Sequence, residues 1–283
     1  MFKQYKKYYE QINKNDIDHW IELNETLRNE KNIIHQIWFG IIPNEEEAKK
    51  TFIKFNKYSN SWKEKNPNIY YHCWTLKDCL IFISLFYPNY ISIINSFKYI
   101  IQFCDFVRYV ILYHYGGLYV DMDYFCNKSF EKIFNSDKYN VCLVETKNKI
   151  SNNVHVSNSL MYSKYPFHIF WKRLIRRIKY NNVFNFNRHY IIMYTTGPGI
   201  LNQCYWEEKK EDISFFPYKL FHPFGIKDIK ILNNLSKNIY AVHIGKGSWE
   251  TNDSKILLLL YEKWYLYILI LGFLLFVFTL SKN

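Results

Sequence analysis

The feature that most constrains this chain lies between residues 102 and 123, where a helix pattern, a glycine pair, a strand pattern and two aspartates follow one another without a break. Apolar residues recur at helical spacing up to Tyr115, and Gly116-Gly117 predicts a left-handed cap that ends the helix. Leu118–Val120 predicts a short buried strand that runs directly into Asp121-Met122-Asp123. A helix joined to a buried strand by so short a turn favours an α/β fold.

The residues upstream predict more of the same sheet. Strands are expected over 33–38 and 70–74, and helices over 45–60 and 77–86, with Pro88 ending the second helix. Strand, helix, strand and helix in this order favour parallel strands with helical crossovers. Residues 1–30 predict a polar helical lead-in. No linker divides residues 31–255, so we expect one catalytic domain over that range.

The charge balance limits the choice of partners. The chain carries 37 basic and 25 acidic residues, a formal net charge of +12, which attracts phosphate-bearing partners such as nucleotide sugars, anionic lipid or nucleic acid. The lysines are scattered and no nucleic-acid-binding motif is present, so nucleic acid is not expected as a partner. The six cysteines show no metal-binding or redox spacing, and most are predicted to be free thiols.

The last part of the chain predicts a membrane anchor. Residues 264–280 run without a charge, which is about the shortest length that spans a bilayer. Aromatic residues at its start, together with Lys263 and Lys282, suit the two interfacial regions. We expect a single-pass C-terminal anchor of endomembrane or Golgi type. The cytosol is the favoured side for the catalytic domain because no N-terminal signal is visible; a buried C-terminal helix is the alternative.

Asp121 and Asp123 carry the clearest chemical signal. Two carboxylates at the end of a strand can share one divalent cation, Mn²⁺ or Mg²⁺, if the chain bends there, and the cation can hold a diphosphate. A solvated turn is the alternative for such a pair on its own. Asp105 and Arg108 lie three residues apart on one face of the preceding helix. They form either a surface salt bridge or part of a cleft, and the nearby aspartates favour the cleft.

The block from Cys104 to Asp123 resembles the signature of the family 32 glycosyltransferases, which carry an Asp-x-Asp sugar-nucleotide motif on a GT-A fold. The strand 34–38, Thr196-Gly197-Pro198 and the segment 243–249 resemble further motifs of that family in the same order, so the resemblance spans residues 31–255. Short sequence features at Tyr87-Pro88, at residues 156–161 and at Met193 resemble those of the subgroup that mannosylates inositol phosphoceramide. The chain departs from the family at 74–78, where Trp-Thr-Leu-Lys-Asp replaces the expected Trp-Thr-Asp.

The resemblance implies a role for each matching residue. Asp123 and His243 would bind the metal ion, and Asp121 would contact the sugar or ribose and share in the metal shell. Asp105 and Arg108 would bind the donor sugar hydroxyls. A core histidine is the alternative for His243. The donor side would further include Trp38, for which core packing is the alternative, together with Lys246, Ser248 and Trp249; the acceptor side would include Asn158, Thr196 and Gly197.

Together with the aspartate pair, the resemblance implies a metal-dependent, retaining glycosyltransferase. The donor would be a GDP- or UDP-sugar, with GDP-mannose preferred, and the acceptor a glycolipid, such as a sphingolipid, or a glycan. No carboxylate stands out as a covalent nucleophile, so attack from the leaving-group face is expected. Two alternatives remain. One is a catalytically inactive carbohydrate- or nucleotide-binding membrane protein, and the other is a phosphohydrolase, which would need more metal ligands than one Asp-x-Asp supplies.

Overall fold

The computed structural model describes residues 3, 5–40, 45–146, 155–180, 187–207, 212–221 and 235–245. The chain forms two compact units. The first comprises Met1–Val183 and Ile192–Lys246, and the second comprises Phe184–Ile191 and Gly247–Asn283. Of the second unit only residues 187–191 are described. The predicted anchor at 264–280 therefore lies outside the described residues.

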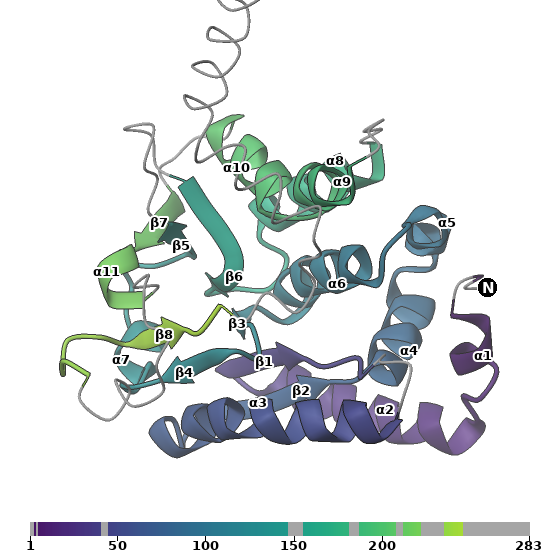
Figure 1. Ribbon diagram of the computed structural model, residues 1–283, viewed down its shortest axis with the longest axis horizontal. Coiled ribbons are helices and arrows are strands. Elements are labelled where there is room, and N and C mark those ends of the chain that lie inside the picture. The colour runs from purple at the N-terminus through teal and green to yellow at the C-terminus, as the bar shows by residue number, and fades with distance from the viewer. Residues whose placement is uncertain are drawn as a thin grey trace, which may run out of the picture. The chain divides into compact units, whose positions relative to one another are not determined.

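A mixed six-stranded sheet forms the centre of the first unit (Figure 1). Its strands follow the order β2-β1-β3-β6-β5-β7. β1 pairs in parallel with both β2 and β3, whereas β6 runs antiparallel to β3 and to β5. The strands are β1 (Ile33–Ile37), β2 (Tyr70–Trp74), β3 (Gly117–Val120), β5 (Val141–Thr146), β6 (His155–Ser163) and β7 (Ile213–Phe216).

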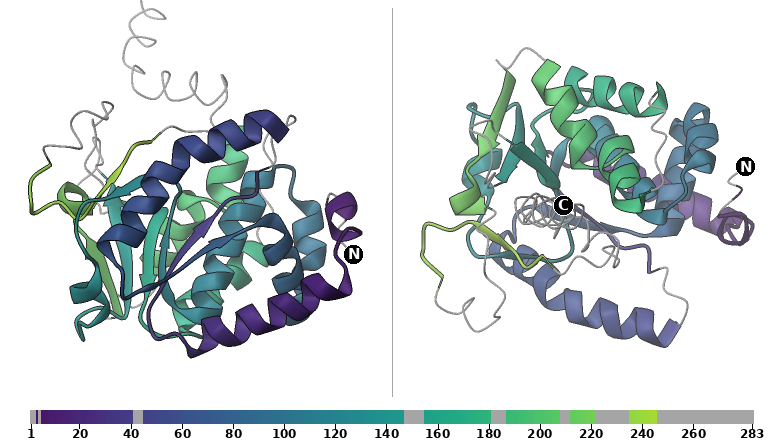
Figure 2. Two further views of the ribbon diagram at one scale, coloured as in Figure 1. Left: turned by 90° about the horizontal axis from the view of Figure 1, so that it is seen from below. Right: turned by 45° about the horizontal axis from the view of Figure 1, so that its top comes forward.

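Helices cover both faces of this sheet, and the right-hand view of Figure 2 shows α3 on one side of the strands and α8 and α10 on the other. The long helices are α2 (Lys14–Asn29), α3 (Glu45–Lys65), α4 (Leu76–Phe86), α6 (Ile100–Tyr115), α8 (Ile169–Tyr180), α9 (Arg188–Thr195) and α10 (Pro198–Glu207). The short ones are α1 (Lys6–Tyr9), η1 (Pro88–Tyr90), α5 (Ile91–Ser96), α7 (Glu131–Phe134) and α11 (Tyr218–Phe221). The predicted α/β class is thus confirmed.

Side-chain alternation along the buried strands produces two hydrophobic cores. Ile33 and Ile37 of β1 belong to the core that packs on α4, α6, α8 and α10. Ile34, between them, belongs to the opposite core, which contains Trp62 of α3. Because successive strand residues point to opposite faces and both faces are covered, β1 is buried along its whole length. Its two polar residues, His35 and Gln36, are buried with hydrogen-bond partners.

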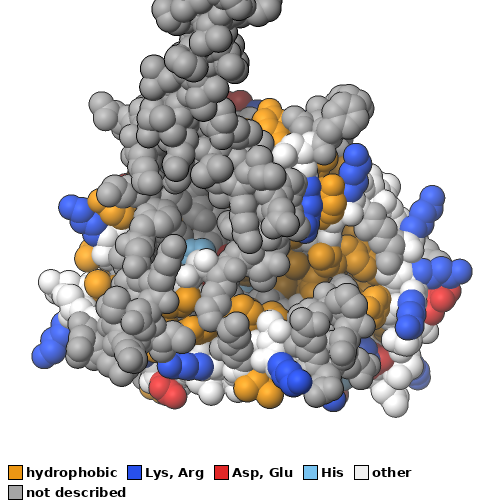
Figure 3. Space-filling model, viewed as in Figure 1, with side chains coloured by type: hydrophobic (Ala, Val, Ile, Leu, Met, Phe, Trp, Pro, Cys, Tyr) orange, Lys and Arg blue, Asp and Glu red, His pale blue; other side chains and the backbone are white. Residues whose placement is uncertain are grey.

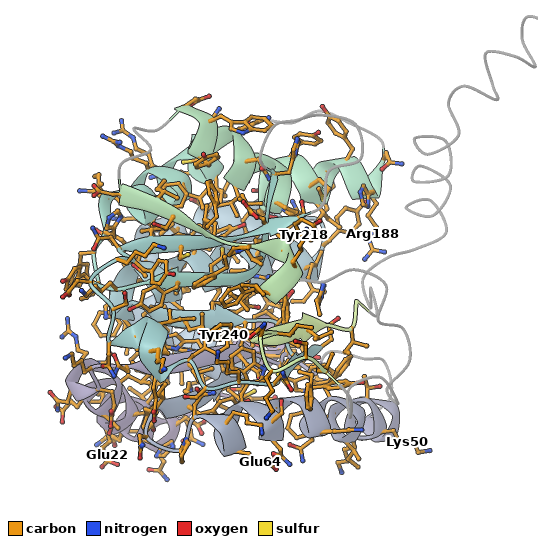
Figure 4. The ribbon with its side chains drawn as sticks, turned by 90° about the vertical axis from the view of Figure 1, so that its left-hand side faces the viewer. Glu22, Lys50, Glu64, Arg188, Tyr218 and Tyr240 are labelled. Carbon is orange, nitrogen blue, oxygen red and sulfur yellow. The ribbon has the colours of Figure 1, made fainter. Side chains whose placement is uncertain are left out.

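A second, two-stranded sheet lies beside the first. β4 (Tyr124–Cys126) pairs antiparallel with β8 (Ala241–His243), a strand far away in the sequence. The ring of Tyr240 stacks on Phe221 of α11 at a centroid distance of 4.8 Å. Figure 4 shows Tyr240 and Tyr218 of α11 on the same side of the molecule, whereas Glu22 and Glu64 lie at its lower edge. β8 is therefore held in place from two directions.

The glycine pair ends α6 as predicted, but Gly116, with a φ of 71° and a ψ of −150°, does not adopt the left-handed helical conformation. Gly116 and Gly117 have φ values of 71° and 84°, a region that favours glycine. A Cβ atom on Gly117 would lie 2.5 Å from the carbonyl oxygen of Ile33. The ring of His35 also contacts this turn: Trp74 donates its indole N–H to Nδ1 of His35, so Nε2 of His35 donates to the carbonyl of Gly116 at 3.0 Å. A neutral, buried imidazole therefore fixes the start of β3.

Most local predictions for this unit are confirmed. The strands at 33–38 and 70–74 match β1 and β2, and all six cysteines are free thiols. The helix expected over 45–60 continues to Lys65. Among the described helices, no single one has the length and apolar character needed to cross a bilayer. Leu76–Phe86 and Pro88–Ser96 meet that requirement only as a pair, with a bend of 110° between them.

Candidate functional site

The two aspartates lie in the short connection from β3 to β4. The backbone N–H of Asp121 donates to the carbonyl of Ser159 on β6 at 2.8 Å, which extends the sheet pairing by one residue. The N–H of Tyr124 then donates to the carbonyl of Asp121 at 3.1 Å. The chain thus turns between the two carboxylates, so the bend that a shared cation requires is present.

Strand pairing brings His243 to the same turn. β8 places His243 opposite Tyr124, and the two rings stack at a centroid distance of 4.6 Å. Nε2 of His243 lies 3.0 Å from Oδ1 of Asp123, and the N–H of Ile244 donates to the carbonyl of Asp123 at 3.0 Å. The His243 side chain is 22% exposed. The structure therefore places this histidine at the edge of the candidate site rather than in a core.

Asp121, Asp123 and His243 lie close enough together to form a possible metal site. One ligand atom from each lies within 4.8 Å of the other two. Ligands about 2.1 Å from one ion are separated by at most roughly 4.3 Å, so a small closure would bring all three onto the same cation. Two carboxylates and one imidazole suit Mn²⁺ and also Mg²⁺, which accepts oxygen ligands more readily.

Arg108 forms ion pairs with both Asp121 and Asp105. Its Nη1 lies 2.9 Å from Oδ1 of Asp121 and its Nη2 lies 3.2 Å from Oδ1 of Asp105. The guanidinium also donates to the carbonyl of Asn158 and lies over the ring of Tyr119, 4.6 Å from its centre. Both partners of the Asp105–Arg108 pair are only 5% exposed. The surface salt bridge alternative is therefore wrong, and the pair is part of a buried network.

The opposite side of Asp105 is held by two further segments. The amide of Asn158, on β6, donates to Oδ1 of Asp105 at 2.8 Å, and the hydroxyl of Thr196 donates to Oδ2 at 3.2 Å. Tyr109 donates its hydroxyl proton to the carbonyl of Thr196 and accepts from Asn158. Every oxygen of this buried carboxylate thus has a hydrogen-bond partner, as the cost of desolvating it requires.

Burial and neighbouring charges shift the pKa values of Asp105, Asp121 and Arg108 in opposite directions. Burial raises the pKa of Asp105 to about 6, although Arg108 and the hydrogen bonds from Asn158 and Thr196 oppose that rise. Burial also raises the pKa of Asp121, again against the attraction of Arg108. For Arg108 burial disfavours the charge, yet Asp121, Tyr119 and Asp105 together hold its pKa well above the usual value. Arg108 is therefore a permanent cation beside both carboxylates.

The remaining predicted donor and acceptor residues fall in different places. Trp38 follows β1, packs against Phe52 and Phe55, and contributes to the same small core as Met122. Gly197 approaches the backbone closely, since a Cβ atom there would lie 2.9 Å from the carbonyl of Ile192. Lys246, Ser248 and Trp249 lie outside the described residues.

Three residues of the site were not predicted. The hydroxyl of Tyr119 donates to Oδ1 of Asp121 at 2.7 Å, and Gln36 donates its amide to the carbonyl of Asp121. Tyr124 supports His243 by stacking. Tyr119 lies two residues before Asp121 on a strand, so the two side chains share a face. That spacing is the signal in the sequence that could have identified Tyr119.

Comparison with known families identifies the central segment. Residues 53–140 match the glycosyltransferase sugar-binding region containing the DXD motif. This segment includes Asp105, Arg108, Asp121 and Asp123, and it ends before Asn158 and His243. The resemblance to the family 32 glycosyltransferases inferred from these residues is confirmed.

Similar curated proteins are found along most of the chain. An inositol phosphoceramide mannosyltransferase of Schizosaccharomyces pombe is 27% identical over 258 residues, 88% of this chain and 66% of its own length. A mannosyl phosphorylinositol ceramide synthase of Saccharomyces cerevisiae is 28% identical over 69% of this chain and 49% of its own. The chain thus spans about half to two thirds of these relatives. The solved structure of the galactosyltransferase LgtC aligns with 78% of this chain and 91% of its own, at 9% identity and a TM-score of 0.42.

Proposed function

We propose that this chain, which carries the sugar-binding region of DXD-containing glycosyltransferases, transfers mannose from GDP-mannose to a glycolipid acceptor in a metal-dependent reaction. In this proposal the catalytic domain has a GT-A-like fold, with the donor bound where β3 ends. The relatives named as mannosyltransferases of inositol phosphoceramide support both the sugar and the lipid acceptor.

The observation that carries the proposal is the meeting of three ligand side chains from distant parts of the sequence. Asp121 and Asp123 follow β3, and β8 brings His243 to them. A divalent cation bound by these residues would neutralise charge on the leaving diphosphate. Arg108 is held against Asp121 on the inner side, so its fixed positive charge faces the place where the donor sugar would lie. Fixed charges of this kind stabilise the charge that develops in a transition state without reorganising.

Positioning is the second task of the network. Asp105 would accept hydrogen bonds from donor sugar hydroxyls, and its carboxylate is already oriented by Asn158 and Thr196. The family resemblance assigned these two residues to the acceptor side; in this proposal they act through Asp105, because both are buried against it. Trp38, near Met122, would stack on the nucleotide, and Gly197 would lie on the acceptor side.

The proposed transfer retains the anomeric configuration by attack from the leaving-group face. Asp105 is the most buried carboxylate of the site, and it is committed to Arg108, Asn158 and Thr196. A carboxylate with these partners is a weak nucleophile, because they stabilise its charge. Mass spectrometry of the protein quenched during turnover is expected to show no glycosyl adduct. A stable adduct on Asp105 or Asp121 would overturn this mechanism.

A lipid acceptor agrees with the surface beside the site. Hydrophobic side chains gather right of centre in the space-filling view, over the N-terminal part of α6 (Figure 3). Ile100 and Cys104, on the N-terminal part of α6, and Phe39, after β1, are partly buried hydrophobic residues that pack against the main core. We retain the prediction that residues 264–280 anchor the chain in a membrane. Resistance of the full chain to alkaline carbonate extraction, and release of a chain that ends at residue 255, would support the anchor.

The experiment that tests the activity is a donor panel. The full chain is incubated with GDP- and UDP-sugars and Mn²⁺ or EDTA, and release of nucleotide and sugar is followed with and without inositol phosphoceramide. The proposal predicts metal-dependent use of GDP-mannose that increases with the lipid. Asp137→Ala, which removes a fully exposed carboxylate, is the matched control for Asp123→Ala. Bound nucleotide without turnover of any donor would favour an inactive binding protein.

A further inference from the structure

One surface far from the aspartates in the sequence combines cations with exposed apolar side chains. α8 carries five basic residues and no acidic residue in twelve positions. Its buried side packs Phe170, Trp171, Leu174, Ile175 and Ile178 into the main core. The opposite side leaves Lys172, Arg173 and Arg176 exposed. Figure 3 shows Lys and Arg side chains at the upper right, where Figure 1 places α8.

The exposed apolar side chains lie at the start of the same helix. Tyr165, Phe167 and Ile169 are 54%, 52% and 48% exposed, and we refer to these three residues as the apolar tip. Ile169, Lys172, Arg173 and Arg176 follow the spacing i, i+3, i+4 and i+7, so they line one face of α8. The apolar tip and the cations are therefore parts of one surface.

Phe167, the central residue of the apolar tip, is held in a fixed position. Phe167 has a φ of 60°, a conformation that is sterically costly for a bulky residue and persists only where the surroundings fix it. Its N–H donates to the carbonyl of Tyr113, and its ring packs edge-on against Tyr113 and His114 of α6. The ring of Phe167 is thus fixed at the surface, where about half of it stays exposed.

We propose that this surface docks onto an anionic lipid bilayer. Apolar side chains that enter the headgroup region, flanked by cations that attract anionic lipid, are the physical requirements for peripheral membrane binding. Charge selects this partner: the polar face of α8 exposes Lys172, Arg173 and Arg176, and the helix carries no acidic residue. A bilayer also accommodates the apolar tip, which a nucleic acid or a soluble acidic protein would leave in water. The proposal does not depend on the sugar transferred.

Amide hydrogen exchange of the full chain on vesicles tests this surface directly. The full chain is bound to vesicles of phosphatidylcholine, with or without phosphatidylserine, and exchange is measured over residues 164–176. Phosphatidylserine is expected to slow exchange there by about tenfold at low salt, and high salt is expected to reverse the effect. Lys172→Glu combined with Arg176→Glu should abolish the slowing. Lys49→Glu combined with Lys57→Glu, which makes the same charge change on exposed positions of α3, should leave it intact.

Each other outcome overturns the proposal. Equal exchange on both kinds of vesicle would show that α8 does not contact anionic lipid. Equal loss of slowing in both double variants would assign the effect to net charge rather than to this surface. Slowing by single-stranded nucleic acid without slowing by vesicles would identify a different partner. Nucleotide release from GDP-mannose in the same samples is a separate readout, so failure of the docking proposal and failure of the proposed activity are distinguishable.

Discussion

The two halves of the candidate site are built in contrasting ways. Asp105 and Arg108, which we term the buried half, have side chains only 5% exposed, whereas Asp123 and His243, the open half, are 15% and 22% exposed. Hydrogen bonds from β6 and from Thr196 fix the buried half, whereas a two-stranded sheet carries the open half. The contrast indicates that the buried half holds the donor-binding side chains in fixed positions, whereas the open half is accessible to a metal ion and the donor diphosphate. Substitutions in the buried half should therefore lower stability as well as activity, whereas those in the open half should lower activity with little change in stability.

The largest expected effect is on activity, in the open half. Asp123→Ala should lower the rate of sugar release by about 1000-fold or more, because a bound cation contributes several kcal/mol to stabilising the leaving diphosphate. The unfolding free energy should change little, since the side chain lies in a turn and is partly exposed. Donor hydrolysis and urea unfolding, each compared with Asp137→Ala, measure the two effects. Wild-type turnover in Asp123→Ala at matched circular dichroism would contradict the site assignment.

A large stability effect is expected in the buried half. Arg108→Met should lower the unfolding free energy by about 3–5 kcal/mol, because it leaves the buried carboxylate of Asp105 without its cation. Arg177→Met, which removes a more exposed cation paired with Glu207, should cost less than about 1 kcal/mol. Urea unfolding of both variants compares a buried with an exposed ion pair on otherwise similar helices. Equal losses of unfolding free energy in Arg108→Met and Arg177→Met would contradict the claim that the buried ion pair stabilises the fold more than an exposed one.

Acid should weaken the strand that supports the buried half. Burial lowers the pKa of His35 from 6.5 to about 3, so below pH 6.5 the unfolded chain binds a proton that the folded chain excludes. The stability from this neutral histidine is complete above pH 6.5 and falls by about 1.4 kcal/mol per pH unit as the pH drops toward 3. His35→Gln should be less stable at pH 7 and show a correspondingly shallower slope. Asp105, with its raised pKa, contributes a slope of the opposite sign, so the difference between variant and wild type isolates His35.

Urea unfolding at pH 7, 6 and 5 provides this measurement, and His19→Gln, at an exposed position on α2, is its control. The control should keep the slope of the wild type. An unchanged slope in His35→Gln would mean that His35 already takes up the proton in the folded state.

The smallest expected effect lies where the halves join. Tyr119→Phe removes the hydroxyl that donates to Oδ1 of Asp121 and keeps the ring beneath Arg108. The unfolding free energy should fall by about 1.5 kcal/mol, the lower end of the range for one hydrogen bond to a charged group. Activity should fall by about tenfold or less, since Arg108 still positions Asp121. A loss as large as that of Asp123→Ala would show that the hydroxyl contacts the donor itself.

The sequence predicts the residues of the helix-turn-strand block better than it predicts His243. Asp105, Arg108, Asp121 and Asp123 lie within that block, so helical periodicity and the glycine pair were sufficient to bring them together. His243 lies far along the chain, and its position depends on the pairing of β4 with β8. No local pattern encodes that pairing, so His243 came only from the family resemblance.

The same reason explains what was missed in the fold. β1, β2 and the helices between them follow local periodicity, and they were predicted closely. The central antiparallel strand β6 separates β3 from β5, and its partners are set by the packing of the whole sheet rather than by its own residues. The roles of Asn158 and Thr196 beside Asp105 follow from that placement, which explains why the sequence alone could not distinguish a positioning role from contact with the acceptor.

The central claim is that Asp121, Asp123 and His243 hold one divalent cation for the donor diphosphate. Titration of Mn²⁺ into the full chain in the presence of GDP, followed by electron paramagnetic resonance, measures this binding directly. The account predicts one bound Mn²⁺ per chain, with affinity lowered on the order of 10- to 100-fold in His243→Ala and more in Asp123→Ala. Equal Mn²⁺ binding by the wild type and both variants would contradict it.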